Sequence, residues 1–195
     1  MYYHVYNRGV GREDIFFEER NYAHFLDSFF LRAGPAVHLY AYCLLKNHFH
    51  LLVRIKTPDE RPQHAQARDS GNIIRLVPPA QHLSNFFNGY AKSMNKGYER
   101  WGALFQHRFK RKALTSDASL VRVTCYIHCN PQIHGFVNDF QNYKHSSYRA
   151  ILDKTDSRIR SGEVLDWFGG SDAYKKLHEK YMAERFVQED EQEFD

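Results

Sequence analysis

Long hydrophobic runs and paired cysteines are what this 195-residue sequence lacks. No apolar run approaches the roughly 20 residues that cross a bilayer, so we predict no membrane-spanning segment. The three cysteines, Cys43, Cys125 and Cys129, are an odd number, and no recognisable secretory leader precedes them. These absences favour a cytoplasmic chain with reduced thiols and argue against a disulfide framework.

Acidic residues are scarce outside the last few positions. The chain has 27 Lys and Arg, 23 Asp and Glu and a net charge of +4, and residues 189–195 hold five of the acids. Without those five, 18 acids face 27 bases, which leaves a body of charge +9. A basic body suits a polyanionic partner such as nucleic acid, although many other soluble proteins carry a similar charge.

The spacing of hydrophobic residues predicts the order β-α-β-β-α-β followed by a further helix. Lys46-Asn47 separates two β-rich runs and predicts a hairpin. This order is typical of an α+β fold, the ferredoxin-like split βαβ sandwich, an antiparallel sheet with helices on one face. Strands are expected at residues 1–6, 37–45, 48–55 and 104–114, and helices at 18–32, 83–94 and 116–129, with Pro131 stopping the last one.

One main domain is expected over residues 1–150. Within it, the polar, proline-punctuated residues 57–79 are expected to form an exposed insertion. Residues 151–195 are expected to be a peripheral C-terminal extension, with an amphipathic helix within residues 167–186 and a disordered acidic end.

The segment Asn47-His48-Phe49-His50 carries the first candidate site. Side chains two apart on a strand share a face, so His48 and His50 point the same way and Phe49 points into the core. Their separation of roughly 6.5–7 Å allows two imidazoles to converge on one metal ion. Taken alone, such a pair is more often two structural or surface histidines.

The segment from Arg122 to Pro131 carries the second candidate site. Tyr126 and Asn130 lie four apart on one helical face, Arg122 lies one turn earlier, and His128 lies on nearly the opposite side. A phenol, an amide oxygen and a guanidinium could serve as nucleophile, metal ligand and phosphate clamp. The alternative is a half-buried tyrosine followed by an Asn-Pro helix exit.

A basic stretch interleaved with aromatic residues precedes that helix. It predicts a surface that follows phosphates and stacks unpaired bases, or else a solvated helix face with aromatic residues in the core. Its basic residues are Lys92, Lys96, Arg100, Arg108, Lys110, Arg111 and Lys112.

Five short motifs, in order, resemble the single-tyrosine HUH transposases of bacterial insertion sequences and their REP-associated relatives. Leu45-Lys46 departs from the Met-Pro that this family often has before its Asn-His, but the change removes no ligand. The motifs are Tyr3–Gly9, Asn47–His50, Gly102–Lys110, Tyr126–Pro131 and Ser146–Tyr148.

The resemblance implies a ferredoxin-like catalytic domain over residues 1–150, a divalent metal, and cleavage of single-stranded DNA near hairpins. It implies Tyr126 as the nucleophile, which forms a 5′-phosphotyrosine link, and His48, His50 and Asn130 as metal ligands. Their donor types suit Mg²⁺ or Mn²⁺. We expect Arg8 and Arg122, with the basic stretch, to contact DNA. One tyrosine per chain holds one DNA end, which favours a homodimer joined through sheet edges.

Three alternatives remain open at this point. A domesticated transposase would keep the fold and bind nucleic acid without cutting it. A replication-initiation or conjugative nicking enzyme would share the chemistry, but is usually longer. A structural zinc protein using Cys125 and Cys129 lacks a second Cys/His pair at finger spacing.

Overall fold

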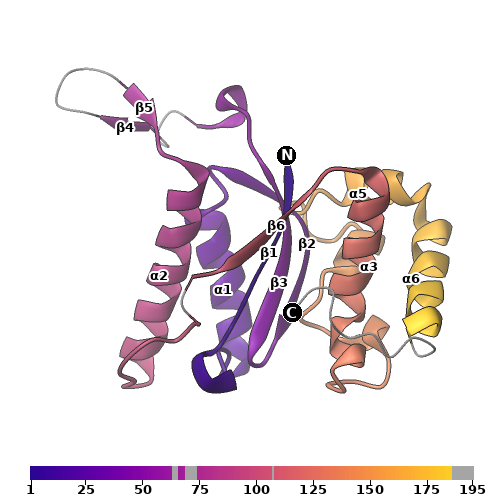
Figure 1. Cartoon of the computed structure of the whole chain (residues 1–195), viewed down its shortest axis with the longest axis horizontal. Helices are drawn as coiled ribbons and strands as arrows, with labels where there is room; N and C mark the ends of the chain where they lie inside the picture. The colour runs from indigo at the N-terminus through magenta and orange to yellow at the C-terminus, as the bar shows by residue number, and fades with distance from the viewer. Residues whose placement is uncertain (63–65, 69–73, 107, 186–195) are drawn as a thin grey trace.

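Figure 1 shows a central sheet flanked by helices in the computed structural model, which describes residues 1–62, 66–68, 74–106 and 108–185. The strands are β1 (Tyr2–Arg8), β2 (Val37–Leu45), β3 (His48–Ile55), β4 (Gln66–Arg68), β5 (Ile74–Leu76) and β6 (Lys110–Leu114). The α-helices are α1 (Glu19–Arg32), α2 (Pro79–Gly97), α3 (Asp117–Ile133), α4 (Tyr148–Leu152), α5 (Ser161–Phe168) and α6 (Ser171–Arg185). No helix in these described ranges is long and apolar enough to span a membrane.

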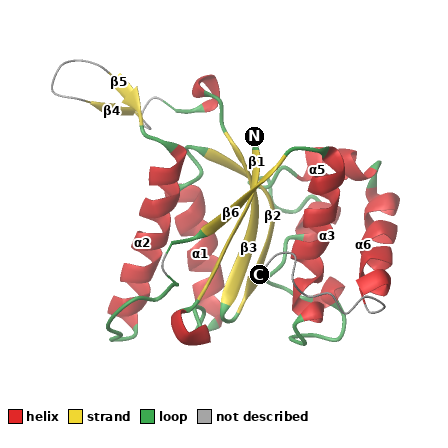
Figure 2. Ribbon diagram, in the orientation of Figure 1, coloured by secondary structure: helices red, strands yellow, loops and turns green. Residues whose placement is uncertain are grey.

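The main sheet has the order β2-β3-β1-β6, and every neighbouring pair is antiparallel. Lys46 and Asn47 form the two-residue turn of the β2–β3 hairpin, where Leu45 pairs with His48, as the sequence predicts. β1 lies between β3 and β6 because helices α1 and α2 each carry the chain across the sheet (Figure 2). This is the expected ferredoxin-like α+β fold.

Helices α1 and α2 cover one face of the sheet (Figure 1). Their aromatic residues meet the strand residue Phe49, whose ring centroid lies 5.1 Å from that of Phe25 and 5.3 Å from that of Phe87. The additional helix α3 packs on the opposite face, with α5 and α6 beyond it (Figure 1). Strands β2 and β3 are therefore mostly buried on both sides, whereas β6 is largely exposed, and the second face carries the helix with Tyr126.

Strand β6 is shorter than predicted, since it begins at Lys110 and not at residue 104. Before it, Phe105 makes only an isolated bridge to Gly9, and the Gln106 amide donates to the Arg8 carbonyl over 2.9 Å. Arg108 then has a φ of +68°, which an extended strand cannot accommodate. The left-handed residue breaks the ladder and delays the regular strand.

Two helix boundaries also differ from the sequence prediction. Pro131 does not end α3, which runs on to Ile133, because a proline removes only one hydrogen bond so near the helix end. Helix α2 begins four residues before Leu83, with Pro79 at its first position, where the missing N–H costs nothing.

The helix expected within residues 167–186 is α6, and the structure adds α5 before it. Gly169 and Gly170, with φ of +81° and +112°, separate the two helices. Phe168 and Tyr174, one from each helix, belong to the same buried cluster as the sheet. The division of the chain at residue 150 stays a prediction, and the acidic end lies outside the described residues.

The insertion contributes a short 3-10 turn, Pro58–Glu60, and a separate two-stranded sheet, β4 with β5, that projects from the body (Figure 1). Residues 57–60 are exposed, as expected. Residues 63–65 and 69–73 lie outside the described part.

The outer edge of β2 is occupied by later parts of the same chain. Cys43 forms a bridge with Ser146, and Leu39 forms a parallel bridge with Ile159. The Leu44 amide donates to the His145 carbonyl over 2.9 Å, and the Arg160 amide donates to the Leu39 carbonyl over 3.0 Å. We expected a sheet edge to join the homodimer. In the main sheet, among the strands that the structure describes, β6 is the edge whose outer side pairs with no other part of the chain.

Candidate active site

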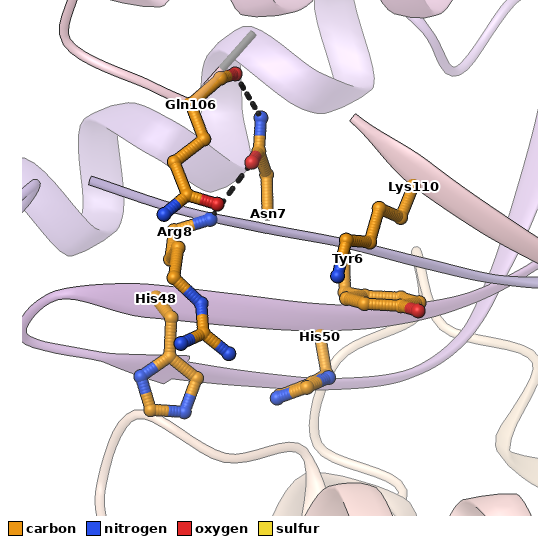
Figure 3. Close-up of a pocket in the computed structure, with 7 residues that line it drawn as sticks. All are labelled: Tyr6, Asn7, Arg8, His48, His50, Gln106 and Lys110. Atoms are coloured by element: carbon orange, nitrogen blue, oxygen red, sulfur yellow. Dashed lines mark hydrogen bonds between the residues drawn. The ribbon is translucent and has the colours of Figure 1, made fainter. Parts of the chain in front are cut away.

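The pairing of β1 with β3 gathers polar side chains on the face of the sheet that α3 covers. Arg8 pairs with His48 and Tyr6 pairs with His50, and residues that pair across an antiparallel ladder share a face. Lys110 pairs with Tyr6 from the other side and adds its ammonium group. Figure 3 shows these residues around one small pocket, with Arg8 reaching from β1 toward the two histidines.

His48 is held by one amide side chain and faces another. Its Nδ1 lies 2.7 Å from Oδ1 of Asn47, and its Nε2 lies 3.0 Å from Oδ1 of Asn130. If Nδ1 donates to Asn47, the Nε2 lone pair of the neutral ring faces the Asn130 oxygen. Two acceptors at this distance repel unless a proton or a cation lies between them, so the pair has the character of two ligands.

His50 is buried, and its two nitrogens have different surroundings. Nδ1 lies 2.9 Å from Nε2 of His4, whereas Nε2 has no hydrogen-bond partner among the described residues. Burial lowers the pKa of His50 well below its usual value, and the neighbouring His4 and His48 add to the effect. The ring is therefore neutral near pH 7 and can offer a lone pair.

The fold brings Tyr126 beside these histidines, although they lie far from it in the sequence. Its ring centroid is 5.3 Å from that of His50 and 5.8 Å from that of His4. The side chain is only 2% exposed, and the guanidinium of Arg185, at the end of α6, lies 5.6 Å from the ring centroid. The candidate nucleophile is thus close to the candidate ligands and covered.

The residues that position α3 explain why Tyr126 faces the sheet. Ser116 caps the helix, with its hydroxyl accepting from the Ser119 amide. On the opposite side of the helix, His128 Nε2 lies 2.8 Å from the Ser147 hydroxyl, and His128 Nδ1 lies 2.9 Å from His178 Nε2. These contacts fix the rotation of α3 and turn Tyr126 and Asn130 toward β3.

Three donor atoms could together hold a divalent cation: Nε2 of His48, Nε2 of His50 and Oδ1 of Asn130. The buried His50 nitrogen without a partner and the facing acceptors of His48 and Asn130 fit this role. In the described ranges no group of three or more His, Cys, Asp or Glu is placed to bind a metal, so the third ligand would have to be the amide. Two imidazoles with an amide oxygen suit Mg²⁺ or Mn²⁺.

The structure distributes the predicted DNA-contacting residues over both sides of the sheet. Arg8 and Lys110 line the histidine pocket, and Lys112 pairs with His4 on the same face. Arg108 and Arg111 line a separate cavity of about 730 Å³ on the α2 side, together with Phe87 and Phe105.

The other basic residues lie farther from the histidines. Lys92 and Lys96 are exposed on α2, Arg100 forms a 2.5 Å ion pair with Glu13, and Arg122 is exposed on α3. The basic stretch does not form one continuous surface.

Sequence reasoning did not single out several residues that the fold brings to the site. His4 and Tyr6 belong to the β1 motif, but only the register with β3 reveals their proximity to His50. Asn7 donates from its side chain to the Gln106 carbonyl and helps to hold the segment before β6. The His134 ring lies 5.0 Å from His48, just beyond the end of α3.

The cysteines do not support the structural zinc alternative. All three are buried free thiols, and burial raises the pKa of Cys125 to about 12 and those of Cys43 and Cys129 well above their usual value. Among the residues that the structure describes, these thiols belong to no group of three or more His, Cys, Asp or Glu that could hold a metal ion.

The His-x-His pair lies on an inner strand of a ferredoxin-like sheet, beside a helix that carries a tyrosine and an asparagine. This is the arrangement that the resemblance to the single-tyrosine HUH class implies. No protein-family model matches the chain. It is 24% identical over 136 residues to a curated Haemophilus influenzae protein named "Putative REP-associated tyrosine transposase", covering 68% of this chain and 67% of that protein.

A solved structure has the same fold. It is a REP-associated tyrosine transposase bound to a REP hairpin, with a TM-score of 0.56, 14% identity and coverage of 79% of each chain. The resemblance of this chain to the REP-associated tyrosine transposases is therefore confirmed.

Proposed function

We propose that this protein is a transposase-like enzyme that binds hairpin-containing single-stranded DNA, cleaves it through Tyr126 and transfers the strand. The observation that carries the proposal is the convergence of four residues from β3 and α3. Asn130 lies 3.0 Å from His48, and Tyr126 stands edge-on to His50 at 5.3 Å. The named relatives, one of them bound to a hairpin, support the same class of substrate.

In this proposal Tyr126 is the nucleophile. Its oxygen forms a bond to the scissile phosphorus, while the bond from phosphorus to the 3′ oxygen breaks and that oxygen leaves with a proton as a 3′ hydroxyl. The phosphodiester energy is retained in the 5′-phosphotyrosine link, so another 3′ hydroxyl can reverse the step and join two strands. A phenol must lose its proton to attack, so a general base has to accept that proton.

His48, His50 and Asn130 would hold a Mg²⁺ or Mn²⁺ ion. When bound, such an ion supplies Lewis-acid stabilisation of the charge on the phosphate. Arg8 and Lys110, which line the same pocket, would bind the flanking phosphates and orient the strand.

A non-catalytic DNA-binding protein of the same fold is the second candidate. It is favoured by the burial of Tyr126, which is 2% exposed beneath the guanidinium of Arg185. Cleavage requires that DNA binding uncover this side chain, whereas simple binding does not.

A covalent-adduct assay separates the two candidates. The purified protein is mixed with labelled single-stranded hairpin oligonucleotides and Mn²⁺ or Mg²⁺, and the products are separated on a denaturing gel. We expect an adduct that is lost in Tyr126→Phe and in His48→Ala. Tyr3→Phe is the matched control, because Tyr3 lies on the same sheet but hydrogen-bonds to Met1 away from the histidines. Tight binding without an adduct across a broad pool of hairpins would favour the DNA-binding protein.

The domain division and the oligomeric state complete the proposal. We propose residues 1–150 as the catalytic domain and residues 151–195 as an extension that supports it. Because one tyrosine holds one DNA end, we also propose a homodimer, for which the outer side of β6 is the available sheet edge. Sedimentation that shows a monomer both free and on DNA would contradict the dimer.

A further inference from the structure

We propose that His4 is a positioning residue, which accepts a hydrogen bond from Nδ1 of His50 and so keeps the Nε2 lone pair of His50 available to a metal ion. This inference rests on the metal site of the proposed function. It concerns a residue to which that function assigns no role.

The contact between the two rings is close and buried. His4 Nε2 lies 2.9 Å from His50 Nδ1, His4 is 0% exposed and His50 is 2% exposed. The two strands place them diagonally, since His50 pairs with Tyr6 and His4 pairs with Leu52. The burial of both rings therefore shields this contact from solvent.

Only one proton can lie between the two nitrogens, and its position decides what His50 can bind. If His4 Nε2 carries the proton, it donates to His50 Nδ1, and a neutral His50 must then be protonated at Nε2. If His50 Nδ1 carries it, His4 accepts, and Nε2 of His50 is free to coordinate. A neutral imidazole has one donor and one acceptor nitrogen, so no other arrangement of two neutral rings satisfies this contact.

The surroundings of His4 hold its ring in place. The residue is 0% exposed, so the ring has no room to turn away from His50. The ring stacks on Tyr6 at 4.8 Å and meets the ring of Tyr126 edge-on at 5.8 Å, so its orientation is fixed. Histidine ligands generally donate their second N–H to such an outer acceptor, and its loss commonly weakens metal binding about 10- to 100-fold.

The test measures Mn²⁺ binding to the full chain without DNA, from the electron paramagnetic resonance signal of free Mn²⁺. We expect His4→Leu to weaken binding about 10- to 100-fold. His4→Gln should remain close to wild type, because its amide oxygen can accept from His50 Nδ1. His24→Gln, which changes an exposed histidine on α1, is the control. Equal affinity of wild type and His4→Leu, or no Mn²⁺ binding by wild type, would overturn the inference.

Nitrogen NMR of the histidine rings provides a readout that does not depend on the metal. We expect the proton of His50 on Nδ1 in the wild-type protein, with the signals assigned by comparison with His50→Gln. A proton on Nε2 of His50 in metal-free wild type would overturn the inference even if His4→Leu does not fold. The proposed function can fail independently, since an absent DNA adduct combined with His4-dependent Mn²⁺ binding would reject the cleavage and retain the role of His4.

Discussion

Acidification should destabilise the protein between about pH 6.5 and pH 5, because buried histidines are neutral in the folded chain. The clearest case is His178 on α6, which lies 2.9 Å from His128 and hydrogen-bonds through Nδ1 to the Tyr174 carbonyl. Burial lowers the pKa of His178 to about 4, and that of His128 well below its usual value. In the unfolded chain both should titrate near pH 6.5.

Stability falls with pH because the unfolded chain binds these protons more readily than the folded chain does. The unfolded chain is protonated first as the pH falls, so the stabilisation is complete above about pH 6.5 and is lost progressively toward the folded pKa. For His178 the loss reaches about 2 kcal/mol at pH 5, at about 1.36 kcal/mol for each pH unit. The buried His4 and His50 pair adds a loss in the same range. Carboxylates such as Asp156, whose pKa is lowered by its hydrogen bond with Arg158, lose their contribution only at lower pH.

Urea unfolding followed by tryptophan fluorescence measures this effect, since the half-buried Trp167 stacks on the buried Tyr40. The free energy of unfolding should fall by at least about 2 kcal/mol from pH 7.5 to pH 5. In His178→Gln the fall in the free energy of unfolding between pH 7.5 and pH 5 should be smaller by about 2 kcal/mol, whatever the stability of the variant at pH 7.5. His24→Gln, at an exposed position, should leave the fall unchanged. A free energy that does not change over this range, or a fall that His178→Gln does not reduce, would refute the reasoning.

Three further predictions concern the metal, the basic residues and the core. Mn²⁺ at about 100 times its dissociation constant should stabilise the wild-type protein by about 2.7 kcal/mol, measured by thermal unfolding, and His48→Ala or Asn130→Ala should abolish the gain. Lys110→Gln, at the histidine pocket, should reduce the slope of log affinity against log salt for single-stranded DNA by about 0.7, whereas Lys96→Gln on α2 should leave it unchanged in a fluorescence-anisotropy titration. Phe49→Ala should cost about 3–5 kcal/mol in urea unfolding, and Trp101→Ala, at a 95% exposed side chain, less than about 0.5 kcal/mol.

The sequence predicted those features that local spacing determines. The β2–β3 hairpin followed from two β-rich runs with a two-residue separation, and the rotation of α3 followed from the spacing of Tyr126, His128 and Asn130. The structure places Asn130 against His48 and turns His128 toward Ser147, as that spacing requires. Their roles in catalysis and metal binding stay predictions.

Features that depend on contacts between distant segments were not predictable in the same way. The register of β1 against β3, which brings His4 to His50, depends on side-chain packing across the sheet. The delayed start of β6 depends on a left-handed Arg108, a conformation that an arginine seldom adopts and that no local pattern indicates. The basic stretch does not form one surface, because strand alternation places Lys110 and Lys112 on the opposite face of β6 from Arg111.

The covered edge of β2 has a practical consequence for expressing parts of this chain. A fragment that ends at residue 150 would lose Ile159 and Arg160, and with them the hydrogen bond to the Leu39 carbonyl. It would present the backbone of a hydrophobic strand to solvent, where a second molecule could pair with it. Aggregation of such a fragment would then reflect a lost intramolecular cover, and a short helper peptide spanning residues 155–185 should restore its solubility.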